Sequence, residues 1–287
     1  MPGMIIDGGV ESVPGLDVRS WQDDGRLRLR MGEDGRRRST RWVRGICLHT
    51  TLGLPFDPAS GGASPDGSPG PLNYPRILPG RGPFTDVAAM TNRWWSTNGE
   101  HGGAHVVADF DGSIACLADL TLEEAYHAGP VNEVSVGIEI AQRKDGAVYA
   151  EQLDAVARLC LWLTERLRIQ RTVPKMYRQG IVAPRLAAKG KDVVGVYGHR
   201  DVTTSRGFGD PGDAIFARLI DVGFEPLDLH RGEDLDVWKV RQHALGVAAD
   251  GIPGPLTAAA IARWQGSRHY CATGVLTLLE REELDRA

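Results

Sequence analysis

The stretch Val193-Val194-Gly195-Val196-Tyr197-Gly198-His199-Arg200-Asp201-Val202 decides the fold. Its first residues are apolar and mostly β-branched, which predicts a buried strand over 193–197 that ends near His199. Asp210 follows and precedes a predicted helix over 211–222, whose first-turn proline is well placed. A histidine at a strand end and an acid at a helix start therefore lie on either side of one connecting loop.

A second histidine occupies the same kind of position. Residues 42–49 read as a buried strand that ends in His49. A hydrolytic zinc site needs three protein ligands and an open position for water, and His49, His199 and Asp210 offer such a set. Each residue also has an ordinary explanation: a lone histidine is more often a satisfied core or surface residue, and Asp210 alone suits a helix N-cap.

Strand and helix patterns alternate through most of the chain, which predicts one α/β domain over about residues 15–225. The Asp111-Gly112 pair between two apolar runs predicts a hairpin. Residues 53–83 are rich in Gly and Pro and predict a long loop, either bordering the active site or a disordered insertion. Further strands are predicted at 18–21, 104–108, 113–117 and 134–140, and further helices at 85–95 and 151–169.

The last part of the chain has a different pattern. Residues 224–228 read as a linker, and after them the apolar spacing is helical only. Val237, Val240 and Leu245 recur at helical spacing, and further helices are predicted over 258–265 and 276–284. This predicts a small, separate three-helix domain over 228–287.

Composition excludes several classes of function. The net charge of −4 and the pI of about 6.1 give no reason to expect a nucleic-acid partner. No stretch approaches a transmembrane span, so no membrane partner is expected. The four cysteines are scattered without a Cys-x-x-Cys pair, which argues against a four-cysteine zinc cluster and a disulfide scaffold. The basic run Arg36-Arg37-Arg38, with Arg41 and Arg44, is interpreted as a solvated loop.

The chain start bears on localisation. Residues 1–13 lack the basic start and continuous apolar core of a signal peptide. We therefore expect synthesis in the cytoplasm and export by another route.

Several short segments together resemble the type-2 N-acetylmuramoyl-L-alanine amidases, the zinc amidase family of phage endolysins, bacterial muropeptide amidases and peptidoglycan-recognition proteins. They occur in the family's order and span about residues 42–220. The resemblance implies a mixed central β-sheet flanked by helices, with zinc held by His49, His199 and Asp210. The matching segments are His49-Thr50-Thr51, Gly103-Ala104-His105-Val106-Val107, Asp111-Gly112, Tyr126-His127-Ala128-Gly129 with Asn132, Ser135-Val136-Gly137-Ile138-Glu139, Gly198-His199-Arg200-Asp201-Val202 and Asp210-Pro211-Gly212.

The same resemblance suggests two catalytic side chains. Glu139 is a carboxylate in an otherwise apolar strand, which is costly unless it has a function. In the family a strand glutamate at this place is the general base, although Glu139 could instead point to solvent. The family's equivalent of His127 lines the substrate cleft, where it would hydrogen-bond the developing oxyanion or the substrate carbonyl; a role in bracing its turn is equally compatible.

Candidate substrate contacts follow from the same comparison. Asn132 resembles a residue that contacts the substrate peptide. Trp94 and Trp95 would line the base of a groove for sugar or peptide unless they pack in the core. The chain departs from the family at Phe208, where several members carry a lysine that assists the oxyanion. Arg206 lies nearby, but a guanidinium does not replace an ammonium directly.

The C-terminal part resembles the three-helix peptidoglycan-binding domain of cell-wall hydrolases. The resemblance is carried by 240–246, by Asp250-Gly251-Ile252-Pro253-Gly254-Pro255-Leu256-Thr257, by Ala260-Ile261 and by Trp264-Gln265. A generic helical dimerisation module is the alternative interpretation.

Together the two resemblances imply a monomeric zinc amidase that cleaves the bond between N-acetylmuramic acid and L-alanine in peptidoglycan. Its place of action would be the cell wall, reached by a phage-type or other non-classical route. The alternatives are a non-catalytic peptidoglycan receptor and a zinc peptidase that cuts within the stem peptide.

Overall fold

The structure, a computed structural model, describes residues 2–29, 37–38, 43–51, 77–97, 102–143, 146–174, 195–202, 210–227, 235–251, 255–268, 276 and 278–286. Its centre is a six-stranded sheet in the order β11-β4-β8-β6-β7-β3. The pairs β11–β4, β4–β8, β8–β6 and β7–β3 are parallel, and β6–β7 is antiparallel, so the sheet is mixed as expected. The strands are β3 (Val18–Ser20), β4 (Gly45–Thr50), β6 (Val106–Ala108), β7 (Ile114–Cys116), β8 (Ser135–Ile140) and β11 (Gly195–Gly198).

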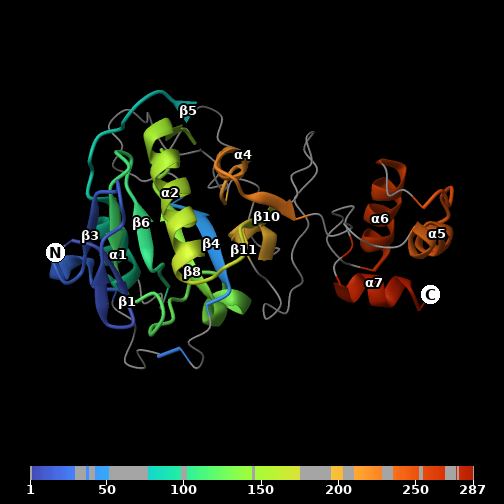
Figure 1. Cartoon of the computed structure of the whole chain (residues 1–287), viewed down its shortest axis with the longest axis horizontal. Helices are drawn as coiled ribbons and strands as arrows, with labels where there is room; N and C mark the ends of the chain where they lie inside the picture. The colour runs from blue at the N-terminus through green and yellow to red at the C-terminus, as the bar shows by residue number, and fades with distance from the viewer. Residues whose placement is uncertain are drawn as a thin grey trace.

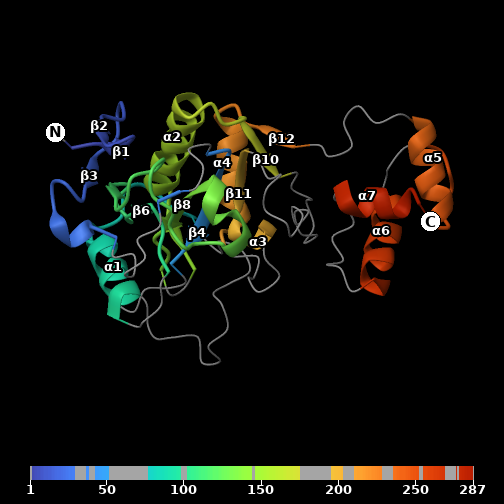
Figure 2. The ribbon, with the colours of Figure 1, turned by 90° about the horizontal axis from the view of Figure 1, so that it is seen from below.

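Helices cover both faces of this sheet (Figures 1 and 2). On one face lie α2 (Ala150–Arg166) and α4 (Asp213–Asp221), which pack on each other and on the apolar side chains of the strands. The predicted α2 stripe is confirmed, because Leu153, Val156 and Leu163 are all in the main core. The other face is covered by α1 (Val87–Thr97), η2 (Gly129–Val134) and the short α3 (His199–Val202). Helix α1 also packs on η1 (Gly25–Leu27).

The turn between β6 and β7 is the predicted hairpin. The Gly112 N–H donates to the carbonyl of Asp109 at 3.0 Å, and Gly112 has a φ of 82°, which glycine adopts without strain. The sheet registers place Val107 of β6 opposite Ala115 of β7 and Glu139 of β8. Because side chains alternate along each strand, Val107 and Glu139 leave the same face of the sheet.

The N-terminal residues contribute more to the core than their polar composition indicates. Strand β1 (Met4–Ile6) pairs antiparallel with β2 (Gly9–Glu11) through an Asp7-Gly8 turn with φ values of 50° and 78°. All three residues of β1 are buried in the main core. The expected domain start at residue 15 is therefore too late, although Asp7-Gly8 is the same hairpin signal that was recognised at Asp111-Gly112.

Two segments expected to be irregular contain short parallel strands. Within the predicted 53–83 loop, β5 (Ile77–Leu78) pairs with β9 (Val148–Tyr149); residues 52–76 lie outside the described part of the chain. Within the predicted linker, β12 (Glu225–Leu227) pairs with β10 (Thr172–Pro174). The linker prediction was wrong at 225–227. These residues form a strand by pairing with residues 172–174, and their own local sequence does not show that partner.

The C-terminal prediction of helices is confirmed by α5 (Leu235–Ala244), α6 (Pro255–Ser267) and α7 (Leu278–Leu284), which lie side by side in both views. They share an apolar cluster of Trp238, Ile261, Leu276 and Leu284. The spacing of Val237 and Val240 indicated the wrong face of α5, because Val240 is 61% exposed and Trp238 is buried instead. No helix among the described residues is long and apolar enough to span a membrane.

Candidate metal centre

His49 lies near the end of β4, and its strand neighbours define the site. In the parallel β4–β8 ladder His49 is the register partner of Glu139, so both side chains leave the same face of the sheet. Neighbouring strands are about 4.8 Å apart, which places an imidazole and a carboxylate side by side at the carboxyl ends of two strands. His49 is buried and Glu139 is half-buried.

His199 reaches His49 from the start of α3, directly after β11, and Asp210 reaches it from the segment before α4. His199 is the first residue of α3 rather than the last of a strand, a correction of one residue. Asp210 does not open a helix, since α4 begins at Asp213 with Gly212 in the cap position. The Asp210 carboxylate instead accepts a hydrogen bond from the Thr50 N–H at 3.0 Å.

The three predicted ligands are brought together and are all buried. His49 Nδ1 lies 3.0 Å from His199 Nδ1 and 4.0 Å from Asp210 Oδ1, and His199 Nδ1 lies 3.2 Å from Asp210 Oδ2. Ligand atoms around a tetrahedral zinc ion are about 3.3 Å apart, given bonds near 2.0–2.1 Å. Two imidazoles and a carboxylate at these separations fit zinc in both donor chemistry and spacing.

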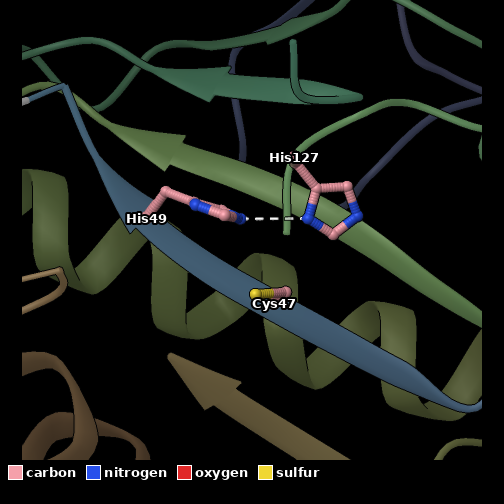
Figure 3. A group of neighbouring side chains, drawn as sticks. All are labelled: Cys47, His49 and His127. Carbon is pink, nitrogen blue, oxygen red and sulfur yellow. Dashed lines mark hydrogen bonds between the residues drawn. The ribbon is translucent and has the colours of Figure 1, made fainter. Parts of the chain in front are cut away.

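A second donor group shares His49 (Figure 3). Cys47, two residues earlier on the same strand face, lies with His49 and His127 within 4.8 Å by their donor atoms. His49 Nε2 and His127 Nδ1 are 3.0 Å apart, so these two nitrogens already share a hydrogen bond. Burial, assisted by the carboxylate of Asp210, raises the pKa of the Cys47 thiol well above its usual range. The Cys47 side chain packs in an apolar cluster with Ala128 and Val131, whereas the donors of His49, His199 and Asp210 face one another, so the His49–His199–Asp210 group fits zinc better.

His127 is held in a tightly bonded turn. The Asn132 side-chain oxygen accepts from the backbone N–H groups of His127 and Ala128, at 3.1 and 2.7 Å. The His127 ring lies against Gly137, where a Cβ would come within 2.5 Å of its Cγ. Burial, with the nearby Arg38 cation, lowers the pKa of His127 to about 3. The Asn132 oxygen thus braces the turn, while its contact with substrate stays a prediction.

Arg38 departs from the interpretation of the basic run as a solvated loop, whereas Arg37 is exposed as expected. Its buried guanidinium donates to the carbonyls of Asn132, Glu133 and Ser135 at 3.0, 2.7 and 2.6 Å. Burial lowers its pKa to about 10, so it remains charged at neutral pH. Arg38 therefore secures the η2 turn beneath the site. The sequence did not indicate that Arg38 is buried, because it lies in a run of arginines that is typical of an exposed loop.

The remaining predicted site residues differ in how the structure places them. Trp95 is 9% exposed and packs in the α1 core, whereas Trp94 is 52% exposed, so the pair does not act as one surface. A role of Trp94 in a substrate groove stays a prediction. Arg206 and Phe208 lie outside the described residues. His105 is fully buried, and its Nδ1 accepts from the Gly137 N–H at 3.0 Å, which gives it a structural role.

A mixed β-sheet flanked by helices, with a buried His-His-Asp set beside a strand glutamate, defines a class of α/β protein that could hold a metal ion. The family model for N-acetylmuramoyl-L-alanine amidase matches residues 39–213, which is more than half of the chain. The chain belongs to this family.

Three solved structures illustrate what the chain is similar to. The hydrolase AmiA of Staphylococcus aureus shares 16% identity over 61% of this chain and 63% of its own, with a TM-score of 0.35. The Drosophila peptidoglycan recognition protein SD shares 15% identity over 72% of this chain and 94% of its own, with a TM-score of 0.39. The amidase LysC of Clostridium intestinale shares 17% identity over 52% of this chain and 87% of its own, with a TM-score of 0.32. No curated protein matches the sequence.

Proposed function

We propose that the protein is a zinc-dependent amidase that hydrolyses the bond between N-acetylmuramic acid and L-alanine in peptidoglycan. The observation that carries the proposal is the convergence of His49, His199 and Asp210 at one sheet edge, next to Glu139 in register. Membership of the amidase family supports the choice of bond.

His49, His199 and Asp210 would hold the metal through Nδ1, Nδ1 and a carboxylate oxygen. Zinc bound there supplies a Lewis acid, which polarises a carbonyl and makes a water molecule more acidic. The Thr50 N–H fixes one oxygen of Asp210, while its other oxygen faces His199. Such second contacts keep ligands oriented before the metal arrives.

Glu139 is the candidate general base. Its position beside His49 places a carboxylate where it can take a proton from the attacking water. It would then pass the proton to the amine nitrogen of L-alanine as the amide bond breaks. The products are the lactyl carboxylate of the sugar and a stem peptide with a free amine.

The C-terminal helices would serve a second purpose. We assign residues 228–287 to attachment on peptidoglycan, on the strength of their sequence resemblance to wall-binding domains. Their separate apolar cluster around Trp238 supports an independently packed unit. Attachment to an insoluble polymer raises the effective concentration of an enzyme at its substrate.

Two variants of the full chain test the metal and the base separately. His199→Ala should lose zinc by metal analysis, because one of three ligands is gone. Glu139→Gln should keep zinc and fold but lose activity on purified muropeptides by about 10²–10⁴-fold, the usual contribution of a general base. Gly25→Ala, which adds a Cβ that meets no atom within 4 Å, is the matched control.

The outcomes also discriminate the alternatives. Zinc retained at wild-type level in His199→Ala would reject the ligand set. Mass spectrometry of digested sacculi should show intact glycan and a free L-alanine amine. Cleavage within the stem peptide would identify a peptidase, and binding without any product would identify a receptor.

A further inference from the structure

A line of four hydrogen-bonding groups runs from His49 into the η2 turn. His49 Nε2 lies 3.0 Å from His127 Nδ1, and His127 Nε2 lies 3.3 Å from the Ser135 hydroxyl. The Ser135 hydroxyl in turn donates to the carbonyl of Val131 at 2.7 Å. The side chains in the line are buried, so each polar group depends on its neighbour in the line.

The carbonyl at the end of the line sets the direction of every hydrogen bond. The Val131 oxygen can only accept, so the Ser135 hydroxyl proton points to it and the Ser135 oxygen accepts from His127. His127 then carries its proton on Nε2 and presents a lone pair at Nδ1. His49 must therefore donate from Nε2, which leaves the lone pair of its ring on Nδ1.

His49 Nδ1 is the atom that faces His199 and Asp210. We propose that His127 is a positioning residue, which accepts the Nε2 proton of His49 and so selects the tautomer whose Nδ1 is ready to bind the metal. This inference deepens the proposed function and rests on it. It departs from a catalytic role of His127, since both of its ring nitrogens already face His49 and Ser135.

The surrounding turn keeps His127 in this position. The His49 and His127 rings meet edge to face at 90°, with centroids 5.1 Å apart. Asn132 ties down the backbone of the turn, and Gly137 makes room for the ring. The position of the His127 ring is therefore fixed by the hydrogen bond of its backbone to Asn132, by its packing against Gly137 and by the hydrogen bond of its Nε2 to Ser135.

Variants of the full chain test this role through zinc affinity and the His49 tautomer. His127→Leu removes the acceptor, and His127→Asn keeps an oxygen near the place of Nδ1. Zinc affinity is measured by competition with a chelator, and the tautomer of His49 by long-range ¹H–¹⁵N correlation in both zinc-free and zinc-loaded protein. Gly25→Ala is again the control.

We expect the wild type to show His49 protonated at Nε2 even without zinc. In His127→Leu we expect mixed tautomers and zinc binding weakened about 10–100-fold, as for other residues that orient a ligand. His127→Asn should recover most of the affinity. Wild-type affinity and an unchanged His49 tautomer in His127→Leu would overturn the inference.

Two further results keep the conclusions separate. If His127→Leu does not fold, Ser135→Ala is measured instead. A lower fraction of Nε2-protonated His49 together with weaker zinc binding in Ser135→Ala would support the inference. An unchanged His49 tautomer and an unchanged zinc affinity would overturn it. If the wild type binds no zinc, or His199→Ala binds it normally, the proposed metal centre fails. The zinc-free tautomer of His49 still reports on the line of hydrogen bonds in that case.

Discussion

At the scale of single residues, Cys47 distinguishes the two donor groups that share His49. Its sulfur lies in the buried core beneath the site, packed with Tyr197 and Val202. Transfer of a thiolate to such a place is unfavourable, which is why burial raises its pKa. Its surroundings are those of a small apolar side chain.

We therefore expect Cys47→Ala to retain one zinc per chain, with affinity within about threefold of the wild type because a side chain outside the ligand set is changed. Metal analysis and chelator competition provide the measurement, with His199→Ala as the comparison. Loss of zinc from Cys47→Ala, with retention in His199→Ala, would assign the metal to the Cys47–His49–His127 group instead.

Gly137 is a second residue whose size matters. A methyl group there would lie 2.5 Å from His127 Cγ, an atom fixed close to the backbone. We expect Gly137→Ala to destabilise the protein by about 1–3 kcal/mol, the usual effect of overpacking, and to weaken zinc binding by displacing His127. Thermal unfolding and chelator competition measure the two effects.

Gly25→Ala is the matched control, because a Cβ at Gly25 meets no atom within 4 Å. Equal stability and zinc affinity of Gly137→Ala and the wild type would show that the ring of His127 moves freely. That result would contradict the packing described here.

At the scale of elements, the η2 turn links the sheet to the site. Its carbonyls at Asn132 and Glu133, and the one at Ser135, receive the Arg38 guanidinium. The sequence predicted the strands on either side of this turn well, since apolar periodicity is a local property. It did not predict the partner of the turn, because Arg38 is more than 90 positions away along the chain.

We expect Arg38→Met to lower the free energy of unfolding by more than about 2 kcal/mol. The methionine fills much of the space but leaves buried carbonyls without their donor, at about 1–3 kcal/mol for each such group. Urea unfolding of the full chain, followed by tryptophan fluorescence, measures the change.

Arg26→Met serves as the control, because Arg26 is largely exposed and water screens its ion pair with Asp24, which therefore adds little to stability. If the two variants unfold at the same urea concentration, Arg38 does not stabilise the turn.

At the scale of the whole molecule, the sheet unit and the C-terminal helices have separate apolar clusters. The structure moves the boundary between them, because β12 continues to Leu227 and pairs with β10. A truncation after residue 225 would remove part of this strand pair, so the appropriate fragment is 1–227.

We expect residues 1–227 to cleave soluble muropeptides at a rate close to that of the full chain but to bind intact sacculi poorly. The candidate metal and base residues all precede residue 227, and attachment matters only when the substrate is a surface. Turnover on soluble fragments and a sacculus pull-down of 1–227 and 228–287 test this. A folded, zinc-loaded 1–227 without turnover would place the C-terminal helices in the active site.

The sequence by itself determined the order of most strands and helices and the Asp111-Gly112 hairpin, and it named His49, His199 and Asp210 as the candidate ligand set. These follow from local periodicity, turn chemistry and a resemblance carried by short motifs. Only the tertiary structure decided the hydrogen bonds of His127, the burial of Arg38, the β10–β12 pair and the exposed face of Val237 and Val240. The physical reason is that burial and pairing depend on residues distant in the chain, and a local pattern carries no record of its partner.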